Sequence, residues 1–158
     1  MTRLAFAIVL AAVLVAGCGA AKRPKDDPGA FATKVVDLIV HNKYSDAWGD
    51  LHPVDQQVAP SSEYVGCETR NPVIAVPRTM KVLGVKDESI GIGDGTFVDS
   101  KAVAVRLGFA GNFKVTHTVH VVANDGKWTW ILPAWRYHDY KSDTCPTDAG
   151  SPPPPVQS

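Results

Sequence analysis

The chain has 158 residues, of which 45% are hydrophobic, and its 16 Lys and Arg residues balance its 16 Asp and Glu residues. This length can bury the core of one domain but is too short for two ordinary ones. The balanced charge gives no basic footprint for nucleic acid, so we expect no nucleic-acid partner.

The first residues follow the pattern of a bacterial lipoprotein signal. Arg3 is followed by an apolar run, 4–15, and then by Ala16-Gly17-Cys18. A positive start, a short apolar run and small residues before the cleavage site are typical of secretory signals. The run is shorter than the roughly 20 residues that cross a bilayer. A cysteine at this place resembles the lipobox, in which the thiol is acylated and the lipidated cysteine becomes the new N-terminus. The alternative is an ordinary secretory signal with a chance cysteine.

This pattern divides the chain into four predicted segments. They are a signal peptide (1–17), a lipid anchor and tether (18–29), a folded domain (30–146) and a Pro-rich disordered tail (147–158). As a flexible chain, the tether from residue 19 to residue 29 spans very roughly 20 Å. We therefore expect a mature protein on the outer face of the cytoplasmic membrane, attached through a lipid such as palmitate on Cys18.

The two remaining cysteines, Cys67 and Cys145, are predicted to form a disulfide bond. If Cys18 carries lipid, these two are left as a pair in an oxidising compartment. A bridge that closes a loop of this length stabilises the fold by roughly 4 kcal/mol in the chain-entropy model. The alternative is two free, buried thiols.

The first half of the domain has helical patterns. Asp27 is a suitable cap for a helix that starts at Pro28, and apolar residues then recur at helical spacing as far as Ile39. A second stripe covers 44–51 and ends because a residue before proline is driven toward extended backbone. A third helix is predicted to begin at Ser61 or Ser62, to carry Tyr64 and Cys67 on one face, and to end before Pro72.

The second half alternates apolar and polar residues, which predicts strands. The expected strands are 79–86, 101–109, 113–123 and 127–132, and the last three are joined by tight turns at 110–112 and 124–126. The glycine-rich segment 91–95 is interpreted as a turn or bulge, since no helix follows it as a phosphate-binding loop requires. Helices first and strands later predict an α+β domain with the helices packed on one face of a curved antiparallel sheet. A last helical or irregular piece, 134–141, would return Cys145 to the helix that carries Cys67.

These elements resemble the nuclear transport factor two-like superfamily, in particular its small lipid-anchored members from actinobacteria. The resemblance is carried by the aromatic helix ending in Leu51-His52-Pro53, by Tyr64-Val65-x-Cys67 and by 128–133 on the last strand. It covers most of 28–145. It implies a cone-shaped domain with a pocket between the helices and the concave face of the sheet. Because this fold hosts enzymes, carriers and interaction modules, it does not imply an activity.

The candidate pocket residues are His117, Tyr44, Tyr64, Phe113 and Val115. His117 shares its strand face with apolar neighbours and is expected to point inward, whereas His120 lies three positions on and faces the opposite side. The two histidines therefore cannot chelate one ion together, and we expect neither a metal site nor another cofactor. For His117, a core histidine with one hydrogen-bonded partner remains the alternative to a ligand contact.

Three tryptophans, Trp128, Trp130 and Trp135, form a candidate interaction surface. The alternative is that these rings cover the sheet and the disulfide, because aromatic side chains supply much of the buried area in a small domain. We identify no catalytic residue, since a single inward histidine without an acidic partner does not make a mechanism. The sequence predicts a non-catalytic module that binds an envelope partner protein. The alternatives are a carrier of a small apolar ligand and, third, an isomerase or dehydratase with His117 as base and Tyr44 or Tyr64 as donor.

Overall fold

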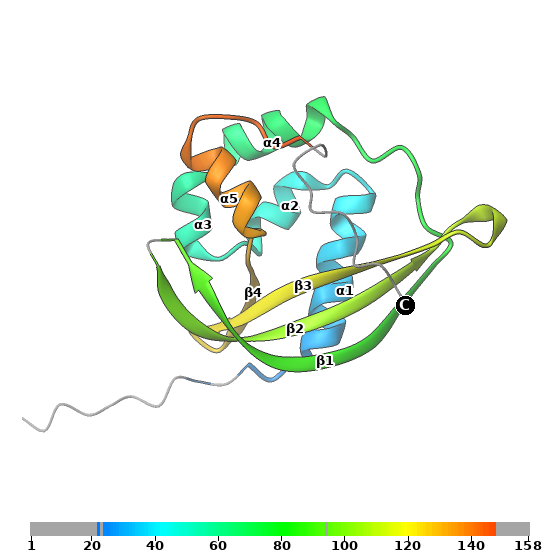
Figure 1. The fold of residues 1–158 in the computed structure, drawn as a ribbon, viewed down its shortest axis with the longest axis horizontal. Helices are drawn as coiled ribbons and strands as arrows, with labels where there is room; N and C mark the ends of the chain where they lie inside the picture. The colour runs from blue at the N-terminus through cyan, green and yellow to red at the C-terminus, as the bar shows by residue number, and fades with distance from the viewer. Residues whose placement is uncertain (1–21, 23, 94, 148–158) are drawn as a thin grey trace, which may run out of the picture.

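The computed structural model describes residue 22 and residues 24–93 and 95–147 (Figure 1). The signal segment, Cys18 and the tail from residue 148 lie outside the described residues, so the predictions for them are not tested by the fold. Within the described residues the elements run in the order α1 (Pro28–Val40), α2 (Tyr44–Gly49), α3 (Pro53–Val58), α4 (Ser61–Arg70), β1 (Thr79–Ile92), β2 (Thr96–Gly108), η1 (Ala110–Asn112), β3 (Lys114–Asn124), β4 (Lys127–Trp130) and α5 (Ala134–Lys141). The α+β class predicted from the sequence is confirmed.

Helix α1 starts as the sequence predicts. The Asp27 carboxylate accepts a hydrogen bond from the backbone N–H of Ala30 (2.8 Å), and Pro28 occupies the first turn. A side-chain acceptor at this position satisfies one of the free amides at a helix N-terminus. Gly29 is already buried in the helix. The folded part therefore begins before the predicted boundary at residue 30.

Helix α3 was not predicted, and the cap predicted for α4 is wrong. His52 has extended backbone (φ −61°, ψ 139°), and Pro53 directly after it opens α3. Proline is favoured in the first turn of a helix because its missing N–H would be unpaired there. At α4, Pro60 holds the cap position, and Ser61 is already helical. Pro60 accepts the amide of Tyr64 at 2.9 Å through its carbonyl, so neither serine caps the helix.

The strands form one antiparallel sheet in the order β1-β2-β3-β4. In its central register Val105 faces His117 and Val103 faces Val119. Gly93 and Gly95 lie in the turn between β1 and β2, as the glycines predict, and Gly93 has a φ of +55°. β1 continues to Ile92, six residues beyond the predicted end at residue 86. It is an edge strand in which residues 83–89 are exposed on both faces, so this stretch shows no alternation of buried and exposed side chains.

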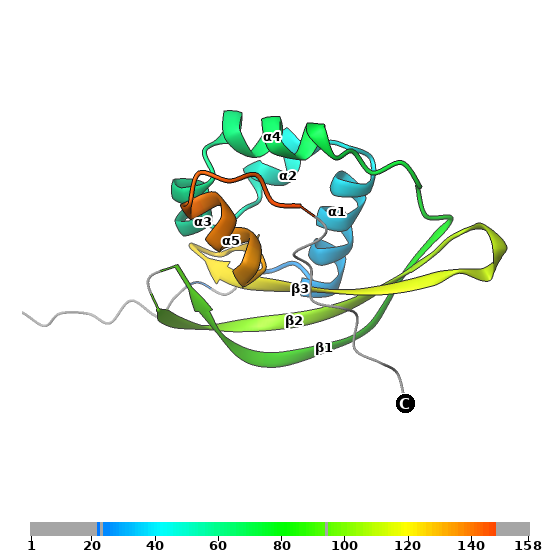
Figure 2. The ribbon, with the colours of Figure 1, turned by 45° about the horizontal axis from the view of Figure 1, so that its top comes forward.

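The helices lie together on one face of the sheet, and the sheet curves beneath them (Figure 2). α1 lies across the sheet and contacts all four strands. The space between the layers is filled by buried side chains, which include Tyr64, Trp130, Tyr140, Leu51, Val35, Val103, Val105 and Val121. The predicted arrangement of helices on one face of a curved sheet is thus present.

The short strand β4 is bordered by the connection between α2 and α3. The backbone N–H of Trp130 donates to the carbonyl of Asp50 (3.0 Å), and the N–H of His52 donates to the carbonyl of Trp130 (2.8 Å). These bonds satisfy backbone groups that an edge strand would otherwise leave unpaired.

Part of the predicted tether is packed on the domain. The indole N–H of Trp128 donates to the backbone carbonyl of Asp26 (2.7 Å). At Gly126, in the β3–β4 turn, a Cβ atom would lie 3.2 Å from the Cβ of Lys22. The expectation of a flexible chain over all of residues 19–29 is therefore wrong for its second half.

Candidate functional site

The two tyrosines of the predicted pocket lie in a closed core. Tyr44 is 4% exposed and Tyr64 is 2% exposed. The Tyr44 hydroxyl donates to the side-chain oxygen of Asn42 (2.5 Å) and accepts from the backbone N–H of Val73 (3.3 Å). The ring of Tyr64 packs against the rings of Trp130 and Tyr140, with centroids 6.4 and 6.0 Å apart. Burial raises the pKa of Tyr64 to about 12, so this hydroxyl stays protonated near neutral pH.

The three other predicted pocket residues, His117, Phe113 and Val115, lie on the first half of β3 or just before it. His117 is exposed although it shares a face with buried Val105, and its imidazole ring forms no hydrogen bond or ion pair with another described residue. Phe113 is 62% exposed and Val115 is half-buried. Tyr64 packs on Trp130, which pairs with Val121, about 25 Å along the strand from Phe113. The structure therefore does not bring the five predicted residues into one pocket.

The chemistry expected of His117 needs a partner that the described residues do not supply. Partial burial of the ring lowers its pKa below the ordinary value of 6.5, so it is mainly neutral at pH 7. A neutral imidazole can accept a proton, but a base also needs an acid or donor close to the same substrate. The other histidine of the pair, His120, lies 3.0 Å from a carboxylate oxygen of Glu88. Among the described residues no group of three or more metal-ligating side chains is present.

The predicted tryptophan surface is mostly internal. Trp130 is 5% exposed, and its indole N–H donates to the carbonyl of Ala47 (2.7 Å). Trp128 is half-buried and holds Asp26, as described above. Trp135 is half-buried, with the guanidinium of Arg136 5.4 Å from the centre of its ring. These contacts favour the alternative interpretation, in which the tryptophans stabilise the domain.

The disulfide between Cys67 and Cys145 is present, and it joins α4 to the segment after α5. A polar cluster beside it links the same elements: Arg136 forms an ion pair with Glu68, and the Tyr140 hydroxyl donates to the same carboxylate oxygen (2.7 Å). Burial raises the pKa of Tyr140 above its ordinary value. Every group in this cluster is engaged with another, so we assign it a structural role.

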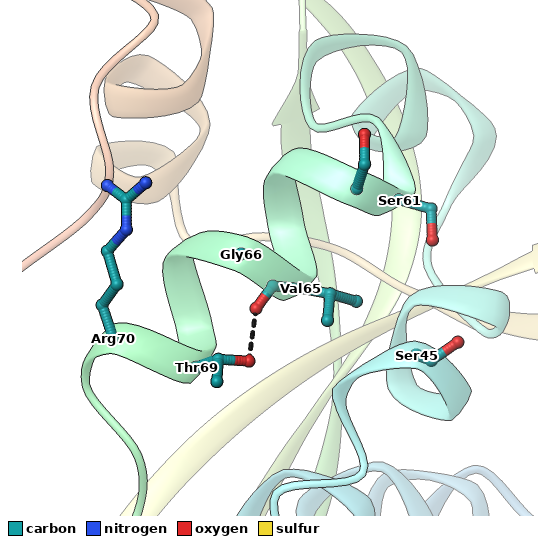
Figure 3. Close-up of a pocket in the computed structure, with 7 residues that line it drawn as sticks. Ser45, Ser61, Val65, Gly66, Thr69 and Arg70 are labelled. Carbon is teal, nitrogen blue, oxygen red and sulfur yellow. Dashed lines mark hydrogen bonds between the residues drawn. The ribbon is translucent and has the colours of Figure 1, made fainter.

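An open groove of about 570 Å³ lies between α2 and α4 (Figure 3). It is lined by Ser45, Ser61, Ser62, Val65, Gly66, Thr69 and Arg70. The Thr69 hydroxyl donates to the carbonyl of Val65 (2.6 Å), and Arg70 reaches the sulfur of Cys145 (3.3 Å). A smaller cleft of about 290 Å³ adjoins it and shares Ser62, Gly66 and Arg70. Neither cleft is lined by a predicted pocket residue. Among the described residues no base accepts a hydrogen bond from the lining serines, as an activated nucleophile requires.

The sequence analysis missed one buried acid, Asp55 on α3. Asp55 is 1% exposed, and one of its carboxylate oxygens accepts the backbone N–H of Leu132 (2.9 Å). The other oxygen is buried without a hydrogen-bond partner. Burial raises the pKa of this carboxyl to about 6, while the bond from Leu132 opposes the shift. Proline at position 53, followed by an acid in the first turn, is the sequence signal that would have placed Asp55 on a helix.

Exposed apolar side chains occur on the segment before β1 and at the β2–β3 turn, and both segments lie toward one end of the molecule (Figure 1). Ile74 is 95% exposed, Val76 is 51% exposed, and the ring of Phe113 contacts that of half-buried Phe109 at 5.9 Å. The segment with Ile74 and Val76 reaches the base of this turn, where the N–H of Arg78 donates to the carbonyl of Gly108 (2.7 Å). We call Ile74, Val76, Phe109 and Phe113 together the apolar end.

No protein-family model matches this chain. No curated protein is significantly similar to it. In the part of the chain that the structure describes, no helix is both long and apolar enough to cross a membrane. The function is therefore argued from the sequence pattern and from the geometry.

Proposed function

We propose that this chain is a non-catalytic lipoprotein, anchored through Cys18 on the outer face of the cytoplasmic membrane, whose domain binds a partner protein of the cell envelope. The anchor is supported by the apolar run that ends in Ala16-Gly17-Cys18. The Cys67–Cys145 bond supports an extracytoplasmic location, because such bonds persist in oxidising compartments. We also propose that the domain is a cone of the nuclear transport factor two-like kind, which the helices on one face of the curved sheet support.

The observation that carries the binding function is the contrast between the interior and the apolar end. The space between helices and sheet is occupied by side chains such as Tyr64, Trp130 and Tyr140, all at most 5% exposed. A ligand carrier would need that space, because small-molecule sites enclose most of the ligand surface. The apolar end instead offers aromatic and aliphatic side chains to the solvent. Exposed apolar side chains that gather at one place are typical of protein-binding surfaces.

Phe113 is the best candidate for an anchor residue at this surface. It is 62% exposed and is supported from one side by the ring of Phe109. Aromatic side chains that a partner can bury completely contribute most to binding energy at protein interfaces. Its exposure also means that its replacement leaves the core packing intact.

The experiment is site-specific photo-crosslinking of the full-length, lipidated protein in membranes of its native host. A photoreactive phenylalanine analogue replaces Phe113 in one variant and Phe97 in the other. Phe97 is a matched control, because it is 72% exposed and lies near the β1–β2 turn at the other end of β2. We expect a discrete crosslinked protein from position 113 and none from position 97. Equal products from both positions, or none from either, would contradict the proposed surface.

A second measurement tests whether the captured protein binds through Phe113. The Phe113→Ser variant should weaken binding of that protein by about 1 to 2 kcal/mol or more, as expected for an interface anchor. The Phe97→Ser variant should bind as the wild type does, and both should unfold at the wild-type urea midpoint. Unchanged affinity of Phe113→Ser would show that the partner does not use the apolar end.

A further inference from the structure

We propose that the end of the domain with the β3–β4 turn faces the lipid bilayer and that the apolar end points away from it. This inference rests on the proposed lipid anchor at Cys18. In this orientation the β3–β4 turn lies next to the lipid surface, and the apolar end is free to bind the partner protein.

The chain that leads to the proposed anchor packs against the β3–β4 turn. Trp128 on β4 binds the carbonyl of Asp26 through its indole N–H (2.7 Å), and the side chain of Asp27 caps α1. Lys22 lies against Gly126, where a Cβ atom would approach the Lys22 Cβ to 3.2 Å. The chain therefore leaves the domain at this turn and not at its predicted boundary at residue 30.

The chain between the domain and the proposed anchor is short. Only four residue steps separate Lys22 from Cys18. Because consecutive Cα atoms of an extended chain advance by at most 3.3–3.6 Å, these steps span no more than about 14 Å. A lipid on Cys18 would thus hold the β3–β4 turn close to the headgroups.

The apolar end lies far from the β3–β4 turn, because the two are at opposite ends of β3. β3 runs from Lys114, next to the apolar end, to Asn124 at the β3–β4 turn. Its 11 residues correspond to about 35 Å of strand at roughly 3.3 Å per residue. Figures 1 and 2 show the start of the described chain and the β2–β3 turn toward opposite ends of the molecule. The apolar end therefore lies farther from the bilayer than the turn does.

The charges at the turn indicate that the tether, and not electrostatic adsorption, sets this orientation. The sequence of this end has four basic residues against three aspartates, an excess of only one positive charge; they are Lys22, Arg23, Lys25, Lys127, Asp26, Asp27 and Asp125. Attraction to an anionic bilayer needs an excess of basic residues and is screened by salt. The orientation should therefore be the same in zwitterionic and anionic vesicles and at low and high salt.

The test measures energy transfer from a dye on the protein to an acceptor on lipid headgroups. The full-length lipidated protein is placed in phosphatidylcholine vesicles with the dye on Lys127→Cys or on Lys114→Cys. Both lysines are exposed and open a strand, one at each end of the domain. The introduced thiol is the free one, since Cys67 and Cys145 are bonded and Cys18 carries the lipid. We expect stronger transfer from position 127 than from position 114, with or without added anionic lipid.

A pair of tryptophan variants tests the role of the tether contact. Trp128→Phe removes the indole N–H that binds Asp26, and Trp48→Phe removes an equivalent bond to the carbonyl of Ala59 (2.8 Å), away from the tether. The difference in transfer between the two dye positions should shrink in Trp128→Phe and persist in Trp48→Phe. An unchanged difference in Trp128→Phe would show that Trp128 does not set the orientation.

The outcomes separate this inference from the anchor on which it rests. Protein that carries no lipid and does not float with the vesicles would contradict the proposed lipoprotein and the orientation together. Lipidated, vesicle-bound protein with equal transfer from positions 127 and 114 would overturn the orientation alone. Stronger transfer from position 114 would place the apolar end at the bilayer.

Discussion

Burial of the Asp55 carboxyl makes its negative charge costly in the folded state. Its pKa is raised from 3.8 to about 6 because the group is withdrawn from water. One oxygen has the N–H of Leu132 as a partner, but the other has none. The folded protein thus prefers the neutral acid, and the unfolded protein ionises more readily. The stability contributed by Asp55 is present below pH 3.8 and is lost as the pH rises through about 6.

We predict that Asp55→Asn removes this pH dependence. A pKa difference of about 2 units corresponds to roughly 3 kcal/mol. Relative to the wild type, the variant should therefore gain about 2 to 3 kcal/mol of unfolding free energy between pH 3.5 and pH 7.5. Urea unfolding at several pH values measures this difference. His52 and His117 have pKa values lowered by burial and contribute with the opposite sign, but they are common to both proteins and cancel.

The control for this prediction is Asp50→Asn. The Asp50 carboxylate is partly exposed and pairs with Lys34 at 2.7 Å. Its replacement should not produce the gain with rising pH that Asp55→Asn shows. If the two variants follow the wild type in parallel across the pH range, the charge of Asp55 carries no cost in the fold.

Helix α3 contacts the β1–β2 turn. The sequence pattern did not predict α3, and it predicted an end of β1 that is too early. Gly93 in the turn has a φ of +55°, and a Cβ atom there would lie 2.7 Å from a methyl group of Val54 on α3. Val54 also packs in a small apolar cluster with Ile92, Val122 and Ile131. The turn is therefore packed against the helix and does not project freely into the solvent.

We predict that Gly93→Ala destabilises the domain by about 2 kcal/mol, because a side chain at positive φ costs roughly 1–2 kcal/mol and the contact with Val54 adds to it. Gly66→Ala is the matched substitution, since nothing lies within 4 Å of a Cβ atom at this helical position. It should stabilise α4 by about 0.5–1 kcal/mol. Urea unfolding of both variants checks this, and equal stability would mean that the turn does not pack on α3.

Elements with a strong local signal could be predicted, and elements that depend on tertiary contacts could not. α1 has a capping Asp27 and a regular apolar stripe, and β3 and β4 have alternation and a tight turn, so all three were placed closely. The His52-Pro53 step correctly ended α2, but the same step also starts α3. Residues 86–89 of β1 are polar and exposed, and only their pairing with β2 reveals them as part of a strand.

Prediction of the candidate site was limited in the same way, because the site also depends on tertiary contacts. The pairing of Cys67 with Cys145 followed from counting cysteines, and it is present. Strand alternation placed His117 on the apolar face of β3, which is also the face of buried Val105, but it could not show that the His117 side chain itself stays exposed. The hydrogen bond from Trp128 could not be predicted either, because its acceptor, the carbonyl of Asp26, is 102 residues away in the chain.

The molecule as a whole has two different ends and a filled interior. The chain enters at the β3–β4 turn, and the exposed side chains of the apolar end lie at the other end of β3. The Cys67–Cys145 bond and the ion pair of Glu68 with Arg136 hold α4 and α5 together over the core. This arrangement suits a domain that is held near a membrane and presents a binding surface away from it.

The most direct test is native and intact-mass spectrometry of the protein extracted from host membranes in mild detergent. We expect a chain that begins at Cys18 and carries lipid, with a mass two hydrogens lower because of the disulfide, and with no small apolar molecule retained. A chain without lipid would contradict the anchor. A stoichiometric adduct that leaves on denaturation would contradict the filled interior and would identify the protein as a ligand carrier.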